Sequence, residues 1–359
     1  HGGGLACTGI LVARASIIES NATGKGGAGG SYTEYAGGEG GAGGRGGGIY
    51  AATSCTATLS NVTIEDNTAG DGGPGGAGEW YPGQGGIGGA GGALYASGVY
   101  TLTNVAIVGN QAGVGGGAAT VNENAAAAGG VGGHGGGVYT NGVGRIINST
   151  VSANTGGQGG QGGSSTSAAG GNGGDGGQGG GIFSDGRLSL ANVTIANNHT
   201  LSGGSGGSGS VPGSQGLAGS GGGIYNQPGK EVRTQDTILG LNVASGNGPD
   251  CWGILQSGGY NLLHHVAYCT LTGTATGNIR SKAPLLGQVG INPPGTTPTQ
   301  ALLFGSPAIN AGNCSGGTVT TDQRGVLRPQ GRACDIGAYE FERARGQLIW
   351  LPAGLRTSP

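Results

Sequence analysis

A unit of about 44 residues recurs through the first two thirds of the chain, and this repeat limits the possible folds more than any other feature. Each copy opens on a glycine run, continues with an apolar and an aromatic residue, and closes on asparagine. Five copies end at Asn67, Asn110, Asn154, Asn198 and Asn242, and an incomplete copy ends at Asn21. The aromatic position holds Tyr50, Tyr95, Tyr139, Phe183 and Tyr225. A fixed period of this length predicts a repeat protein built from equivalent structural units.

Each copy carries a run of strand-forming sequence and no helical pattern. The segment 59–64 alternates apolar with small polar residues and is rich in β-branched types, which favours a strand. A core of about 20 residues is too small to bury its own apolar side, so the copies must stack on one another. We therefore predict an all-β solenoid with one aliphatic column formed by Ile64, Ile107, Val151, Ile195 and Ile238.

Asparagine forms two further columns in the aligned repeats. One contains Asn61, Asn104, Asn148 and Asn192, and the other contains Asn21, Asn67, Asn110, Asn154 and Asn198. Stacked amides can satisfy each other and the turn backbone, so these columns are expected to be structural ladders. Six Asn-x-Ser/Thr sequons occur in the chain, five of them in these columns, and N-glycosylation is the alternative interpretation.

Glycine supplies 94 of the 359 residues, and most of it lies in five insertions between the copies, at about 24–47, 70–91, 112–136, 155–180 and 201–222. The insertions follow an xGG pattern with a period of three, in two legs that flank a tip. Three residues per turn is the period of a polyproline II helix, which leaves its backbone groups free to bond sideways. We expect polyglycine II hairpins that stack into a two-layer slab beside the solenoid, and flexible loops are the alternative.

Charge and hydropathy exclude several classes of partner. The chain has 15 basic and 17 acidic residues, a balance that argues against binding to nucleic acid or to anionic membranes. Its longest apolar runs are far shorter than the roughly 20 residues that span a bilayer. The six cysteines have no zinc-site spacing, which predicts disulfides in an oxidising compartment and no cofactor. Methionine is absent, and we expect a processed, extracellular or cell-surface product without its signal peptide.

No motif in the chain assembles a catalytic or metal site. Gly133–Gly135 matches the Gly-His-Gly of pectin-cleaving solenoid hydrolases, but His134 is also the x residue of an xGG triplet and no aspartate recurs in the strand columns. The segment 170–176 resembles a calcium-binding nonapeptide but has Gly177 where a large hydrophobe is required. His264 and His265 are expected to point to opposite faces of a strand. We therefore expect no enzyme activity and no metal, with a carbohydrate-active enzyme as an alternative.

The C-terminal third carries a specific series of motifs. It contains SPAIN at 306–310, TDQRG at 321–325 and CDIGAYE at 334–340. This series resembles the end of bacterial right-handed parallel β-helix repeat proteins with a choice-of-anchor C-terminal region, and the GGG-I-Y and NVTI rungs resemble polymorphic outer-membrane-protein repeats. The resemblance implies a secreted or cell-surface protein with a right-handed parallel β-helix closed by a disulfide-stapled cap, and no particular reaction. Because the glycine insertions stop near residue 247, we expect the β-helix at 1–247 and the cap region at 248–345, followed by an apolar tail at 346–359.

The positions of the six cysteines suggest one pairing. Cys7 with Cys55 would join adjacent rungs, Cys251 with Cys269 would close a loop in the cap, and so would Cys314 with Cys334. Six cysteines allow 15 connectivities, so this pairing is a hypothesis.

Three functions remain: a structural protein, an adhesin, and the carbohydrate-active enzyme named above, with ice binding as a fourth possibility. We first expect a structural protein, a subunit of a surface filament in which an apolar tail formed by Leu348, Ile349, Trp350 and Leu351 pairs head to tail with the open first rung of another copy. The tail folding back, or upstream residues covering that rung, is the alternative. The second function is an adhesin that binds glycans or surfaces through exposed insert tips with Tyr32, Tyr35, Trp80 and Tyr81. An ice-binding role is suggested by resemblance to polyglycine-type antifreeze proteins, but charged residues on the exposed faces argue against it.

Overall fold

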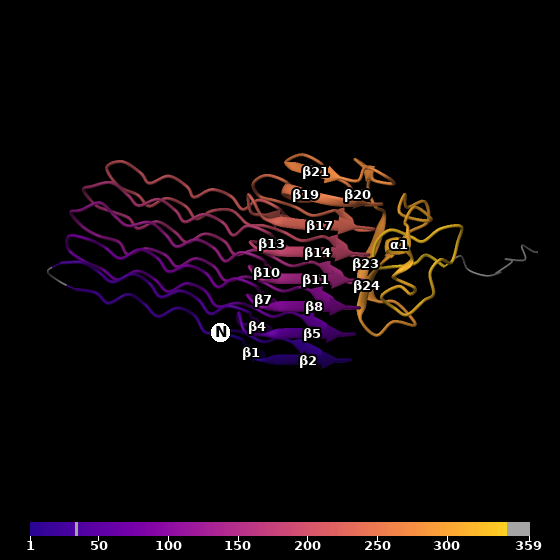
Figure 1. The fold of residues 1–359 in the computed structure, drawn as a ribbon. Helices are drawn as coiled ribbons and strands as arrows, with labels where there is room; N and C mark the ends of the chain where they lie inside the picture. The colour runs from indigo at the N-terminus through magenta and orange to yellow at the C-terminus, as the bar shows by residue number, and fades with distance from the viewer. Residues whose placement is uncertain (33–34, 343–359) are drawn as a thin grey trace, which may run out of the picture.

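Each repeat folds into three short strands separated by tight turns, and equivalent strands of successive repeats pair in parallel and in register (Figure 1). The computed structural model describes residues 1–32 and 35–342. The strands form three long faces of a nearly closed parallel β-solenoid. β19 belongs to both the first and the second sheet and joins them into one sheet of 14 strands, in which β21 pairs with β19 beside the main path. The third sheet has eight strands.

Six repeats contribute a complete set of three strands. The first sheet contains β1 (Leu5–Cys7), β4 (Ile49–Ala51), β7 (Leu94–Ala96), β10 (Val138–Thr140), β13 (Ile182–Ser184) and β16 (Ile224–Asn226). The second contains β2 (Ile10–Arg14), β5 (Thr56–Ser60), β8 (Val99–Thr103), β11 (Val143–Ile147), β14 (Arg187–Ala191) and β17 (Glu231–Gln235). The third contains β3 (Ile17–Glu19), β6 (Thr63–Glu65), β9 (Ala106–Val108), β12 (Thr150–Ser152), β15 (Thr194–Ala196) and β18 (Ile238–Gly240).

The aliphatic column differs from the prediction at its last member. Ile64, Ile107, Val151 and Ile195 stack as expected, but the residue that continues the column is Leu239. Ile238 pairs with Thr194 and belongs to a second apolar cluster, which the C-terminal region completes. The alignment misplaces the fifth copy by one residue because both neighbours are aliphatic. The asparagine spacing, with Asn242 three residues after Leu239, identifies the correct register.

The solenoid continues past the boundary expected at residue 247. β19 (Cys251–Gly259) pairs with β16 and β17, and β20 (Leu262–Leu263) pairs with β18. β21 (Cys269–Gly273) and β22 (Ile279–Arg280) add a further layer. Residues 251–280 are therefore rungs and not part of a separate cap. They carry no glycine insertion, so the pattern that marks the earlier rungs is absent from them.

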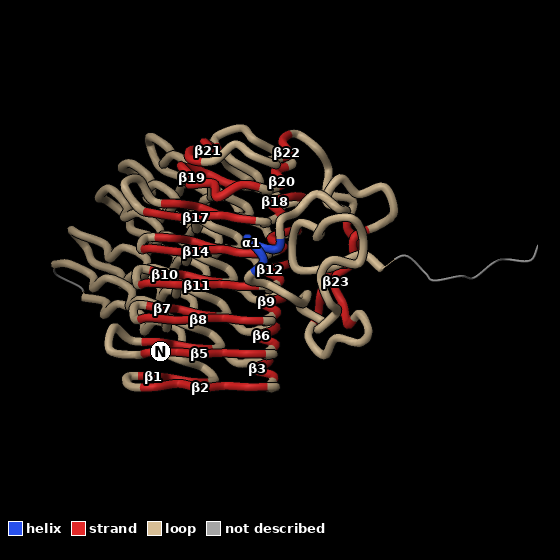
Figure 2. Tube along the Cα trace, turned by 45° about the vertical axis from the view of Figure 1, so that its right-hand side comes forward, coloured by secondary structure: helices blue, strands red, loops and turns tan. Residues whose placement is uncertain are grey.

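The remaining C-terminal residues lie along the side of the strand stack, against the third sheet, and do not cover its end (Figure 2). They contain the antiparallel pair β23 (Leu286–Ile291) and β24 (Pro298–Leu302) and the short helix α1 (Cys314–Gly317). Thr150 Oγ1 on β12 donates to Gln323 Oε1 at 2.7 Å, and the Ala338 amide donates to Thr194 Oγ1 on β15 at 3.0 Å. We call residues 283–342 the flanking subdomain.

The TDQRG and CDIGAYE motifs form a buried ion-pair network inside this subdomain. Arg328 contacts Glu340 at 3.0 Å with both side chains fully buried, and Arg324 contacts Asp322 at 2.7 Å. Burial and the neighbouring Glu340 carboxylate raise the pKa of Asp335 to about 6. Buried, mutually paired charges are costly to separate, so these residues maintain the subdomain's structure.

Three disulfides join Cys7 with Cys55, Cys251 with Cys269, and Cys314 with Cys334. This is the connectivity hypothesised from the sequence. The first links adjacent rungs, the second links β19 to β21, and the third lies in the flanking subdomain. Disulfides of this number are typical of proteins that fold in an oxidising compartment.

The glycine insertions form paired legs that run away from the strands and stack in step with the rungs (Figure 1). The first glycine of a triplet donates to the x-residue carbonyl of the next hairpin, as Gly26 does to Asp71 at 2.8 Å. The second glycine bonds across to the other layer. These cross-layer hydrogen bonds form one continuous zigzag series with one glycine from each of the ten legs. Each glycine after the first donates its amide to the carbonyl of the preceding glycine in the series. The series is Gly27, Gly41, Gly73, Gly86, Gly116, Gly130, Gly160, Gly174, Gly204 and Gly216. We call this arrangement the glycine slab.

Candidate binding surface at the hairpin tips

The tips of the first two glycine hairpins lie next to each other at the end of the slab farthest from the strands (Figure 1). Isolated bridges pair Tyr32 with Gly78 and Ala36 with Tyr81. The Tyr32 amide donates to the Ala77 carbonyl at 2.9 Å, which sets the two tips in register. The slab therefore brings together the two segments that the sequence marked as separate insert tips.

Four large aromatic side chains are exposed on these two tips. Tyr32 is 65% exposed, Tyr35 74%, Trp80 59% and Tyr81 70%. A folded protein normally buries most of the surface of such side chains, and a cluster of exposed aromatic groups marks an interaction site. Backbone hydrogen bonds fix the segments that carry them, with the Trp80 amide donating to the Tyr35 carbonyl at 3.2 Å.

A shallow groove of about 310 Å³ lies beside the aromatic cluster and reaches the third tip. Tyr32 forms one wall, and Glu79 and Glu123 supply carboxylates. Asn124 Nδ2 donates to the Glu79 carbonyl at 2.7 Å and so ties the third tip to the second. We call the four aromatic residues and this groove the tip surface. It combines flat apolar rings with hydrogen-bond acceptors. A sugar can pack its C–H face against such rings and donate hydrogen bonds from its hydroxyl groups to such acceptors.

The predicted aromatic positions form a continuous stack along the first sheet. Tyr50, Tyr95, Tyr139, Phe183 and Tyr225 stack with neighbouring ring centroids 4.7–5.4 Å apart. His1 extends the stack at one end and Trp252 at the other. The sequence pattern did not assign Trp252 to this stack, because its rung lacks the glycine run that precedes the other aromatic positions. Its position directly after Cys251 was the one signal that could have identified it. Burial raises the pKa of Tyr139 to about 12, as expected for a ring that packs and does not ionise.

The two asparagine columns lie at different places in the solenoid. Asn67, Asn110, Asn154 and Asn198 are fully buried, and each donates from its backbone and side-chain nitrogens to the Oδ1 of the next member. The members of the second column adopt positive φ angles of 51–55°, a left-handed conformation that asparagine tolerates better than most residues. They are Asn61, Asn104, Asn148 and Asn192.

The motifs considered for catalysis and calcium have structural partners. His134 stacks on Phe183, its Nδ1 accepts from the Gln178 amide at 2.9 Å, and burial lowers its pKa to about 4. Asn172 and Asp175 each accept a backbone amide of the next hairpin through Oδ1. Several x residues of the xGG triplets thus link neighbouring hairpins through their side chains.

His264 and His265 differ most from their expected arrangement. They follow β20 in a turn and not in a strand, and their rings lie side by side with centroids 3.9 Å apart. The proposed assembly residues Leu348, Ile349, Trp350 and Leu351 lie outside the described residues.

Comparisons with known proteins return no match: no protein family, no curated protein and no solved structure resembles the chain closely enough to be identified. Within the part of the chain that the structure describes, no helix has the length and hydropathy needed to cross a bilayer.

Proposed function

We propose that this chain is an extracellular or cell-surface adhesin that binds a glycan through the tip surface. The observation that carries the proposal is the cluster of four exposed aromatic side chains on two adjacent hairpin tips, beside a groove with two carboxylates. The proposal also includes the right-handed sense of the coil, the polyglycine II geometry of the legs and the kinship with choice-of-anchor β-helix proteins, which the residue motifs suggest.

The glycine slab supports this function mechanically. Its legs are cross-linked by backbone hydrogen bonds, so the tip surface is held at the end of a stiff platform and not on a mobile loop. A site that is ordered before binding loses less conformational entropy when its ligand arrives. The glycine content therefore has a function in the proposal, since it permits the close packing that makes the platform stiff.

A glycan array followed by a binding assay with Trp80→Ala tests the proposal. Wild-type protein is expected to bind a defined set of glycans, and the substitution should weaken binding about tenfold or more because it removes a central aromatic contact. Phe304→Ala is the matched control, since Phe304 is 86% exposed on the flanking subdomain, away from the tips. Binding to no glycan, or equal affinity of Trp80→Ala and wild type, would contradict the proposal.

A filament subunit is the second candidate. The observation that favours it is that, among the described residues, β2 in the first described rung pairs with β5 alone. Ile10 and Ile17 there are 84% and 63% exposed. Such an edge can accept a strand from another copy, which would produce head-to-tail assembly.

A further inference from the structure

The buried asparagine column ends in a carboxylate. Asn242 continues the column, and the next member is Asp250, whose Oδ1 accepts from the Asn242 amide at 3.1 Å and from Asn242 Nδ2 at 2.9 Å. Asp250 is fully buried, and Cys251 in the disulfide follows it directly. The ladder therefore fixes one oxygen of this side chain and leaves the second, Oδ2, directed elsewhere.

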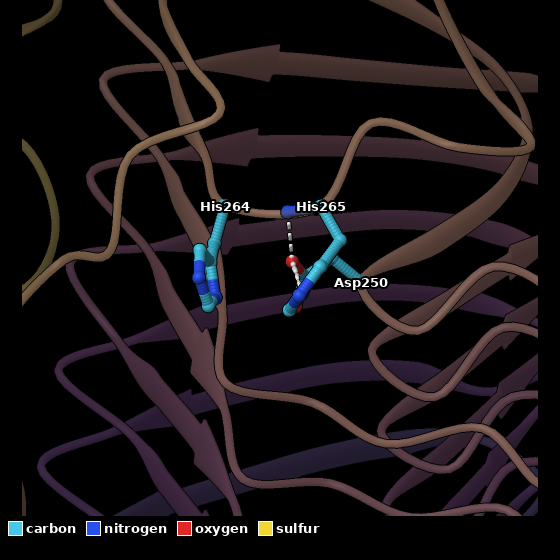
Figure 3. A group of neighbouring side chains, drawn as sticks. All are labelled: Asp250, His264 and His265. Atoms are coloured by element: carbon cyan, nitrogen blue, oxygen red, sulfur yellow. Dashed lines mark hydrogen bonds and ion pairs between the residues drawn. The ribbon is translucent and has the colours of Figure 1, made fainter.

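The second oxygen faces two imidazoles (Figure 3). Asp250 Oδ2 accepts from the His265 amide at 2.6 Å and lies 3.2 Å from His265 Nδ1. The ring of His264 lies beside that of His265. Asp250, His264 and His265 each offer one potential metal-ligand atom, and these three atoms lie within 4.8 Å of one another. The two rings come from the turn after β20, in the same rung whose first strand, β19, directly follows the aspartate.

Among the described residues, one buried nitrogen at this place lacks a hydrogen-bond partner, and the buried carboxylate has hydrogen bonds but no permanently charged partner. His264 Nδ1 is buried and has no hydrogen-bond partner among the described residues. The Asp250 carboxylate has no lysine or arginine within ion-pair distance in the described part of the chain, and His265 is its one possible counter-charge. A buried charge and a buried unpaired nitrogen are both costly, and a cation between them would satisfy both.

We propose that Asp250, His264 and His265 bind a divalent first-row transition ion of the zinc type. Two imidazole nitrogens and one carboxylate oxygen are ligands that such ions prefer. In a tetrahedral zinc site with bonds of about 2.0–2.1 Å, neighbouring ligand atoms lie about 3.3 Å apart, close to the separation of Asp250 Oδ2 and His265 Nδ1. The fourth position is open to water, because the His265 side chain is 48% exposed.

The surroundings also suit this role. The Asn242 side chain orients the carboxylate from behind, as outer hydrogen-bond partners of metal ligands commonly do. An ion here would tie the turn after β20 to the end of the asparagine column.

Calorimetric titration of the EDTA-treated, dialysed full chain with zinc chloride tests the proposal. One zinc ion per chain is expected, with a rise in Tm that grows with zinc concentration. The double variant His264→Ala/His265→Ala should bind at least about tenfold more weakly. His199→Ala is the matched control, since His199 is exposed at the base of a hairpin and belongs to no such cluster.

A second measurement needs no variant. Modification by diethyl pyrocarbonate, mapped by mass spectrometry, should be blocked by zinc at His264 and His265 and unchanged at His199. Absence of saturable zinc binding, or zinc protection that does not include these two histidines, would overturn the proposal and leave Asp250 as the terminal residue of the ladder alone.

Discussion

At the residue scale, the buried asparagines stabilise the solenoid by satisfying backbone groups that the turns leave open. Asn154 Oδ1 accepts from the Asn110 amide and side chain, and its Nδ2 donates to the carbonyls of Ile107 and Ser152. An aliphatic side chain of similar size would fill the same space but would leave these groups unpaired in the core. The Asn-Thr sequons at Asn192 and Asn198 coincide with fully buried side chains, which is incompatible with a glycan in the folded state.

Asn154→Ala is expected to lower the free energy of unfolding by about 3 kcal/mol or more, since several buried donors and acceptors lose their partner at once. Urea unfolding followed by circular dichroism measures the change. Asn141→Ala in the same repeat is the control, because Asn141 is exposed, and a change within about 0.5 kcal/mol is expected there. Similar destabilisation by both variants would mean that the ladder bonds contribute little.

At the element scale, the glycine hairpins owe their order to the absence of side chains. A Cβ atom added at Gly160 would lie 2.0 Å from the Gly116 carbonyl oxygen in the neighbouring hairpin, a distance that no real Cβ contact reaches. Gly27 occupies the equivalent triplet position in the first hairpin, and a Cβ there would meet nothing within 4 Å. Close packing between legs therefore requires glycine at this triplet position. Where a leg has no neighbouring leg beside that position, as at Gly27, a larger residue can be accommodated.

Gly160→Ala is expected to destabilise the slab by about 1–3 kcal/mol, as overpacking commonly does, while Gly27→Ala leaves it unchanged. Hydrogen exchange of residues 155–180 provides the measurement. The glycine amides of the legs should exchange slowly in wild type and in Gly27→Ala, and faster in Gly160→Ala. Fast exchange throughout these legs in the wild-type protein would instead support flexible loops.

At the scale of the whole molecule, the flanking subdomain determines which surfaces stay available. It lies along the third sheet and is anchored there through Thr150 and Thr194, so its residues 283–342 do not cover the edges of β1, β2 and β3. The slab and the flanking subdomain extend from the strand stack in different directions, which separates the tip surface from those edges (Figure 1). Binding at the tips and assembly through the first rung could therefore occur together.

Deletion of residues 346–359 tests the filament hypothesis. If the tail pairs with the first rung of another copy, the full chain should form filaments and the truncated chain should give monomers, as seen by electron microscopy and analytical ultracentrifugation. A negative charge introduced at the receiving edge, by Ile10→Asp, should have the same effect with the tail intact. Filaments that persist in both variants would exclude this mode of assembly.

The sequence alone determined the repeat, the parallel stacking of strands, the two asparagine columns and the aromatic stack, because all of these follow from a period that each copy repeats. It also located the aromatic tips, although only as separate segments. The tertiary structure decided what depends on contacts outside the repeat: Leu239 in place of Ile238 in the aliphatic column, the rungs at 251–280, and the subdomain along the side of the stack. The tertiary structure likewise brought Asp250 next to His264 and His265. The positions of residues that belong to no repeat depend on how the rungs pack on one another, and the local sequence does not determine that packing.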